Sequence, residues 1–171
     1  SDVNFSQDSD QVLLARMLFG EASGCSGDEK MNVAYTALKR AYDGKQNNGE
    51  GLRNATLKSS LRKTRSGTRR IYQYSCFNNS DPVLKKLVDP EKYSSIEWRE
   101  CLSTAEEAIQ NFKYMSYEKR ENLPSHYYNP NGMPLVKKRG NGKVFLVRAE
   151  PSWIYSPKLE KIGRIKNSKH I

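Results

Sequence analysis

The sequence contains few residues of the kinds that bind metal ions. Its 171 residues include only two His and three Cys. Cys25, Cys76 and Cys101 show no C-x-x-C spacing, whereas zinc modules need four ligands at short, recurring spacings. We therefore expect no metal and no other cofactor. Because the number of cysteines is odd, a fully paired disulfide framework is also excluded, although a single bridge is compatible with the count.

Long apolar runs are also missing. No stretch of about 18 apolar residues is present, which excludes a membrane span, and no secretory h-region is recognisable. A chain of 171 residues has the length of one ordinary domain, and neither an internal repeat nor a dividing linker interrupts it. We expect a single domain over residues 1–171, acting as a monomer.

Acidic residues are absent from two long segments. Residues 1–50 hold eight acids and five bases, a net charge of −3, although the whole chain carries +10. The asymmetry predicts either a polyanionic partner, such as nucleic acid or an anionic cell envelope, or a solvated face that keeps the protein soluble. The acid-free segments are residues 51–80, with Arg53, Lys58, Arg62, Lys63, Arg65, Arg69 and Arg70, and residues 122–149, with Lys137, Lys138, Arg139, Lys143 and Arg148.

The first part of the chain has the apolar spacing of two amphipathic helices. Asp10 is expected to cap a helix that runs through Leu18, because its carboxylate can accept from free N–H groups of the first turn. Ser26 and Glu29 stand at capping-box spacing and predict the start of a second helix, which Gly44 would end.

Three further helices are predicted downstream. A short one is expected around Leu57 and Leu61, and Asp81 with the proline after it indicates the start of another. Ser94 and Glu97 form a second capping box, and the helix they begin has the clearest periodicity in the chain. The apolar residues expected to face inward are Val83, Leu84, Leu87 and Val88 in the shorter helix, and Trp98, Leu102, Ala105, Ile109 and Phe112 in the longer one.

Beyond Asn122 the composition changes to proline, glycine, asparagine and aromatics, with a strong strand signal at residues 144–147. Helices followed by a short β-rich C-terminal part predict the α+β class.

Glu21 is the residue with the clearest chemical potential. It follows Leu14 by seven positions, which on a helix brings it within about 20° of the direction of that residue. A helix that continues past Gly20 would aim the carboxyl along the buried stripe, where lost hydration raises its pKa and keeps a proton available. Such a group can act as a general acid. Alternatively, Gly20 ends the helix and Glu21 turns to solvent.

Segments in order along the chain resemble a known family. Residues 14–22 (LARMLFGEA) are similar to an opening L-A-R-hydrophobic-x-x-G/A-E-A helix, and residues 73–77 (QYSCF) to a Q-F/Y-S-C-aromatic motif. Residues 125–129 (SHYYN) with 150–153 (EPSW) are similar to T-H-Y-H/Y-N followed by P-x-W, and residues 162–171 to a closing I-G-x-H-hydrophobic-F-Y element. The chain thereby resembles the SleB/CwlJ-type bacterial cell-wall hydrolases, which include spore cortex-lytic enzymes and phage-borne relatives.

The resemblance implies a mainly helical, lysozyme-like catalytic domain that cleaves the MurNAc–GlcNAc bond of peptidoglycan, with Glu21 as its catalytic acid. It implies a secreted or envelope-associated protein, or a phage protein that acts on the wall of its host. This chain differs from the pattern in a longer, more basic region at residues 46–68 and in extra residues before His170.

The count of well-placed carboxyls bears on the mechanism. Glycoside hydrolysis usually uses two carboxyl groups, whereas Asp28 and Glu29 are explained by a helix start and Asp81 by an N-cap. A lytic transglycosylase needs one, because the C6 hydroxyl of muramic acid attacks C1 within the same molecule and leaves a 1,6-anhydro end. We therefore favour a lytic transglycosylase, with a muramidase- or glucosaminidase-type hydrolase as the alternative.

Aromatic and hydrogen-bonding residues of the same motifs are the candidates for binding the sugars. Planar faces and polar edges suit N-acetyl hexosamines, although each such residue has a packing role as its simpler explanation. The candidate substrate-binding residues are Gln73, Ser75, His126, Tyr127, Tyr128 and Trp153. Cys76 is interpreted as a small buried residue of the core.

Two non-enzymatic functions compete with this hypothesis. Arginines beside Tyr72 and Tyr74 would suit a single-stranded nucleic acid, but no helix-turn-helix, zinc-finger or ribonucleoprotein motif is present, which disfavours nucleic acid. A wall-binding module without catalysis would make Glu21 dispensable. In the favoured interpretation the partners are peptidoglycan glycan strands, with the basic segments holding the anionic surface of the wall.

Overall fold

The computed structural model describes residues 5–42, 51–157 and 170. It divides the chain into two compact units, Ser1–Ser125 (unit 1) and His126–Ile171 (unit 2). Helices and strands are both present, as the α+β class requires. The single domain over residues 1–171 stays a prediction.

Helix α1 (Asp10–Ala22) begins one residue earlier than expected, since Ser9 and not Asp10 is its N-cap. The hydroxyl of Ser9 accepts a hydrogen bond from the backbone N–H of Val12 at 3.3 Å. The helix continues through Gly20 and includes Glu21, so the alternative in which Gly20 ends it is wrong. Its fully buried residues are Leu13, Leu14, Ala15, Met17 and Leu18.

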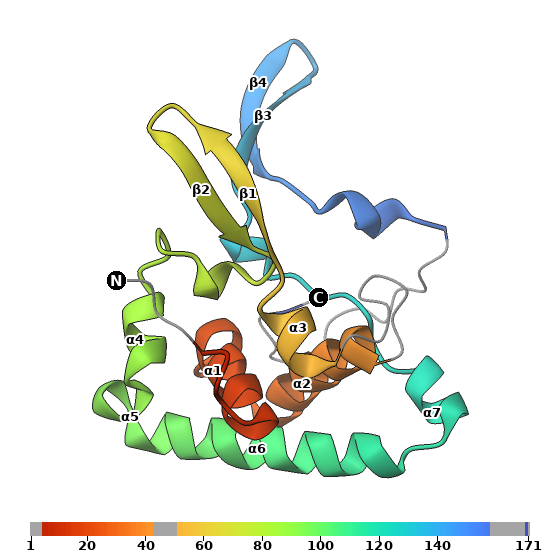
Figure 1. Ribbon diagram of the computed structural model, residues 1–171. Coiled ribbons are helices and arrows are strands. Elements are labelled where there is room, and N and C mark those ends of the chain that lie inside the picture. The colour runs from red at the N-terminus through yellow and green to blue at the C-terminus, as the bar shows by residue number, and fades with distance from the viewer. Residues whose placement is uncertain (1–4, 43–50, 158–169, 171) are drawn as a thin grey trace. The chain divides into compact units, whose positions relative to one another are not determined.

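Both predicted capping boxes begin helices. Ser26 accepts from the N–H of Glu29 ahead of α2 (Gly27–Tyr42), and Ser94 accepts from the N–H of Glu97 at the start of α6 (Ser95–Tyr114). Helix α6 extends along one side of unit 1 and packs against both α1 and α2 (Figure 1). The expected stop at Gly44 lies outside the described residues.

The stripe predicted on α6 is shifted around the helix. Ala105 and Phe112 are buried as expected, but Trp98, Leu102 and Ile109 are only half-buried. The small residues that face α1 and α2 allow close packing and take the most buried positions. These are Cys101, Thr104 and Ala108.

A buried lysine joins α2 to α6. The side chain of Lys30 is fully enclosed, and its Nζ lies 2.9 Å from a carboxylate oxygen of Glu97 and 3.3 Å from one of Glu100. It also donates to the backbone carbonyl of Cys25 at 2.9 Å. Burial lowers the pKa of Lys30, but the two glutamates outweigh that effect and the net shift is upward. The buried cation is therefore fully paired.

The basic segment after α3 (Leu52–Thr56) forms a β-hairpin, so the helix expected around Leu57 and Leu61 is wrong. Strands β1 (Ser59–Thr64) and β2 (Gly67–Tyr72) pair antiparallel. Both faces of the hairpin are exposed, so the alternation of apolar and polar residues that usually reveals a strand is missing. Leu61 is 64% exposed.

Short helices follow the hairpin. They are η1 (Ser75–Phe77), α4 (Leu84–Val88), α5 (Pro90–Tyr93) and, after α6, α7 (Tyr117–Glu121). Asp81 accepts from the N–H of Val83 at 2.9 Å and so supports the turn before α4, but the N-cap is Val83, two residues after the expected Asp81. Leu87 is fully buried as expected, whereas Val88 is 49% exposed.

Unit 2 contains the second hairpin, formed by β3 (Leu135–Gly140) and β4 (Lys143–Arg148). The strand predicted at residues 144–147 is confirmed as part of β4. Asn141 and Gly142 have φ of 52° and 71°, as a two-residue type I′ turn requires. Short 3-10 helices η2 (Pro130–Gly132) and η3 (Ser152–Tyr155) flank the hairpin. In the described part of the chain, no helix is long and apolar enough to cross a membrane.

Candidate functional site

The end of α1 meets the segment at residues 73–77. Gly20 packs so closely on Cys76 that a Cβ at Gly20 would lie 2.7 Å from the Cβ of Cys76 and 3.1 Å from its sulfur. Such a separation is too short for two carbon atoms, so a glycine is needed at this position. Two segments more than fifty residues apart in the sequence are thereby held together beside Glu21.

Glu21 and Cys76 are hydrogen-bond partners. Cys76 is 2% exposed, and this burial raises the pKa of its thiol; the negative charge of Glu21 raises it further. Cys76 therefore keeps its proton across the physiological pH range and donates it towards the half-buried carboxyl of Glu21.

Tyr74 is the second neutral donor near Glu21. Burial raises the pKa of its phenol, Arg40 opposes that shift, and the charge of Glu21 adds to it. The guanidinium of Arg40, on α2, lies 5.9 Å from the centre of the Tyr74 ring. The carboxyl of Glu21 therefore lies near the thiol of Cys76 and the phenol of Tyr74. Tyr74 in turn contacts the guanidinium of Arg40.

Asp81 contributes a second negative charge to this region. Its carboxylate also raises the pKa of Cys76, after burial and Glu21 in importance. One of its oxygens accepts from the N–H of Val83. Asp81 is thus held by its own turn while lying within electrostatic range of the thiol that Glu21 contacts.

The base of the β1–β2 hairpin fixes the same segment. The N–H of Gln73 donates to the carbonyl of Lys58 at 2.9 Å, and the N–H of Tyr72 donates to the side chain of Asn78 at 2.7 Å. Phe77 is buried, with its ring centre 5.7 Å from that of Phe5. These contacts fix the backbone of the segment from which the exposed side chains of Gln73 and Ser75 extend.

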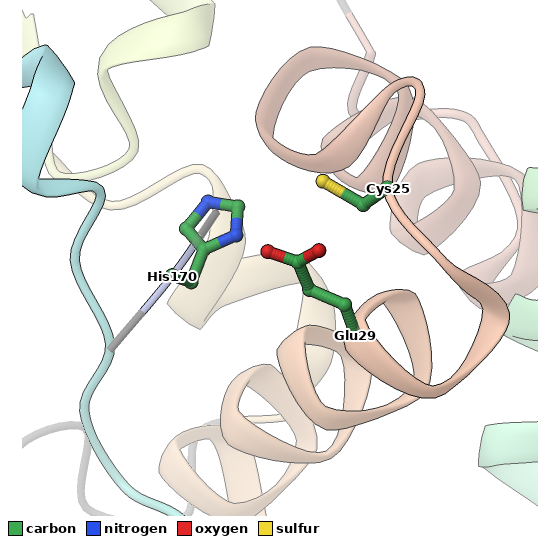
Figure 2. A group of neighbouring side chains, drawn as sticks. All are labelled: Cys25, Glu29 and His170. Atoms are coloured by element: carbon green, nitrogen blue, oxygen red, sulfur yellow. The ribbon is translucent and has the colours of Figure 1, made fainter. Parts of the chain in front are cut away.

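A second carboxyl of unit 1 is buried near the end of α1. Glu29 is 2% exposed, and the sulfur of Cys25 lies within 4.8 Å of one of its carboxylate oxygens (Figure 2). The two come from the turn between α1 and α2 and from the first turn of α2. Figure 2 also draws His170, which belongs to unit 2. A thiol and one carboxylate fall short of the four ligands of a structural zinc site.

The remaining sequence-predicted site residues lie in unit 2, and each packs on another aromatic ring of that unit. The ring centre of Trp153 lies 5.0 Å from that of His126 and 5.6 Å from that of Tyr128, the latter edge-on. Tyr127 meets the ring of His170 edge-on at 5.3 Å. The motifs at residues 125–129 and 150–153 are therefore joined within unit 2 into an aromatic cluster.

Sequence reasoning chose Glu21, Gln73 and Ser75 in unit 1 but did not choose Tyr74 or Arg40. Tyr74 stands in the quoted QYSCF motif, and its position between two chosen residues was a usable signal. Arg40 has no such signal, because only the packing of α2 brings it to Tyr74. Comparisons of this chain with protein-family models, with curated proteins and with solved structures found no match.

Proposed function

We propose that this protein cleaves the glycan strands of peptidoglycan as a lytic transglycosylase with a lysozyme-like catalytic domain of the SleB/CwlJ type. Glu21 is the proposed general acid and base. The observation that carries the proposal is the contact between the end of α1, with Glu21, and Cys76 of the QYSCF segment. Both segments resemble motifs of that family, and they are in contact in the fold, which supports the proposal.

The surroundings of Glu21 suit a group that exchanges a proton. It stands in the last turn of α1, where the negative end of the helix dipole disfavours a charged carboxylate. It is half-buried, so a substrate can reach it while part of its hydration is removed. Its neutral neighbours Cys76 and Tyr74 keep their own protons and so do not compete as bases.

The proposed reaction uses this carboxyl twice. Glu21 gives its proton to the glycosidic oxygen as the bond from C1 of MurNAc breaks, which leaves a 4-hydroxyl on the departing GlcNAc. The C6 hydroxyl of the same muramic acid then bonds to C1 and loses its proton to Glu21. The carboxyl is regenerated, no water is consumed, and the product carries a 1,6-anhydro ring.

The other candidate residues are assigned to binding. Gln73 and Ser75 are exposed next to the buried Tyr74 and Cys76, so their polar groups are available to sugar hydroxyl and acetamido groups. In unit 2, the cluster of His126, Tyr128 and Trp153, together with Tyr127 on His170, provides flat faces that suit hexosamine rings. The exposed cations of the β1–β2 hairpin are assigned to the anionic surface of the wall.

A glycoside hydrolase is the second candidate, and Asp81 favours it. Retaining and inverting hydrolases use a second carboxylate as nucleophile or base. Asp81 and Glu21 both act electrostatically on the thiol of Cys76, so a second carboxylate belongs to the same region. Its hydrogen bond from the N–H of Val83 leaves other lone pairs for a water molecule.

The mass of the released muropeptides separates the two reactions. Purified peptidoglycan is digested with the full chain, and the products are analysed by mass spectrometry without prior reduction. Anhydro ends support the transglycosylase. Reducing ends, heavier by one water, would support the hydrolase, and in that case Asp81→Asn should abolish the activity. Absence of any glycan fragment would contradict both.

A further inference from the structure

The β3–β4 hairpin combines exposed cations with exposed apolar side chains on one face. Residues directly opposite in an antiparallel pair point to the same side of the ribbon. On the face called face A, every such pair joins an aliphatic residue to a cationic one. The pairs are Leu135 with Arg148, Lys137 with Leu146, and Arg139 with Val144.

The aliphatic side chains of face A are well exposed. Leu135, Val144 and Leu146 are 53%, 57% and 61% exposed, and the cations beside them are exposed as well. The opposite face also has exposed cations, Lys138 and Lys143, but its apolar side chains are less exposed: Val136 is 41% and Phe145 is 45% exposed. The Phe145 ring also covers Gly140, where a Cβ would lie 3.0 Å from the ring. Face A is thus the more open side of a two-stranded ribbon, which gains little stability on its own.

The residue types of face A favour one kind of binding partner over others. A second copy of the same face would bring Lys137, Arg139 and Arg148 against their own equivalents, which repel. A nucleic acid would use aromatic side chains for stacking, whereas the apolar residues of face A are all aliphatic. An anionic lipid surface matches both components, since phosphate groups bind cations and the acyl boundary takes aliphatic side chains.

The β1–β2 hairpin provides a contrast within the same chain. Arg62 and Arg69 are directly opposite each other there, and of the two aliphatic residues in its pairs, Leu61 and Ile71, only Leu61 is well exposed. That hairpin has the charge of an anion-binding surface but one well-exposed aliphatic side chain, Leu61, where face A has three. The two hairpins therefore differ in chemistry although both are basic.

We propose that face A of the β3–β4 hairpin docks on the surface of an anionic lipid bilayer. Lys137, Arg139 and Arg148 bind lipid phosphates, and Leu135, Val144 and Leu146 enter the headgroup boundary. The docking is peripheral and does not depend on the catalytic proposal.

Flotation of the full chain with vesicles tests this docking. Vesicles of phosphatidylcholine alone are compared with vesicles that also contain phosphatidylglycerol, at physiological salt. Two double variants separate the components: Lys137→Gln with Arg139→Gln removes charge, and Val144→Ser with Leu146→Ser removes apolar surface. Arg62→Gln with Arg69→Gln is the matched control, since it removes the same charge from the other hairpin. Melting temperatures check that each variant folds.

Binding is expected with the anionic vesicles and not with the neutral ones. Each lost cation should weaken it roughly fivefold, so the Lys137/Arg139 variant should bind about 25-fold more weakly. The serine variant should lose about tenfold or more, while the control stays within a few-fold of the parent. No vesicle binding by the folded parent, or full binding by the serine variant, would overturn the proposal. Tighter binding to single-stranded DNA than to the anionic vesicles would do the same.

Discussion

Gly20 of α1 packs directly on Cys76, with no room for a side chain at the glycine. A Cβ at Gly20 would meet the Cβ of Cys76 at 2.7 Å and a methyl group of Leu87 at 3.3 Å. Because Glu21 is the next residue along the helix, this contact also decides where its carboxyl lies. Packing and the proposed chemistry thus depend on the same glycine.

Gly20→Ala should therefore destabilise the protein. The added methyl group forces Cys76 or α1 to move, and overpacking of this kind costs about 1–3 kcal/mol, in spite of the better helix propensity of alanine. Gly27→Ala is the control, since a Cβ there meets nothing within 4 Å. Denaturant unfolding measures both. Equal stability of the Gly20→Ala protein and its parent would show that the contact is looser than described.

Trp98→Ala should reduce stability by about 2–3 kcal/mol, less than the roughly 3–5 kcal/mol typical of a fully buried aromatic residue. Trp98 is half-buried, with Phe19 edge-on at 6.2 Å between ring centres and the guanidinium of Arg16 at 5.7 Å. Tyr114→Ala, at an exposed position of the same helix, should change it by less than about 0.5 kcal/mol. Thermal melts measure the stability of both variants. Equal melting temperatures of Trp98→Ala and Tyr114→Ala would contradict the packing role of Trp98.

The helices of unit 1 were predictable where a local signal marked their ends. Ser26 and Ser94 cap α2 and α6 as expected. Each hydroxyl accepts from an N–H group three residues later, so this hydrogen bond depends only on residues that are close in the sequence. The shift of the buried stripe on α6 could not be foreseen, since it depends on the small residues that face α1 and α2. A capping residue can therefore be read from the local sequence, whereas the side of a helix that becomes buried depends on the helices that pack against it.

The β1–β2 hairpin was missed for a related reason. Leu57 and Leu61 have helical spacing, but the two strands that follow Leu57 are exposed on both faces and carry no burial pattern. The usable signal was Ser66 followed by Gly67, whose φ of 126° suits the turn between the strands. The position of Glu21 within α1 was predictable from its spacing after Leu14, whereas the contacts with Tyr74 and Arg40 depend on tertiary packing. Its catalytic role stays a prediction.

The buried thiol of Cys101 should make stability depend on alkaline pH. Burial, with the negative charge of Glu97, raises its pKa from an ordinary 9.0 to about 12. In the unfolded chain the thiol ionises first, so its contribution to stability is full below about pH 9 and is lost as pH rises towards 12. The gap in melting temperature between the parent and Cys101→Ala should narrow over that interval. A constant gap would contradict the burial of this thiol.

Replacing Arg62 and Arg69 by Gln should weaken binding to intact walls while leaving the fold at least as stable. Like charges directly opposite on a hairpin are destabilising, so their removal should add a few tenths of a kcal/mol. Wall binding by the parent should fall as salt screens the exposed cations over about 8–10 Å. Sedimentation with purified walls measures the binding, and Lys113→Gln with Lys119→Gln serves as a control of equal charge.

Nucleic acid is the competitor in this experiment. Its binding also weakens with salt, so the salt dependence alone does not identify the partner. The parent is therefore titrated with single-stranded DNA and with purified peptidoglycan at about 0.15 M salt. Turnover of short soluble glycans should be unchanged in the Arg62/Arg69 variant. Submicromolar affinity for DNA, with no product released from peptidoglycan, would instead make the protein a nucleic-acid binder.

The central claim is that Glu21 is the proton donor, and clearance of a peptidoglycan suspension by Glu21→Gln tests it most directly. The amide has the same size and keeps the packing of α1, but it cannot deliver a proton, so clearance should fall by about 10²–10⁴-fold. A melting temperature close to that of the parent shows that the variant is folded, and unchanged sedimentation with walls shows that it still binds. Near-normal clearance by the folded Glu21→Gln protein would contradict the account and move the catalytic role to another carboxyl.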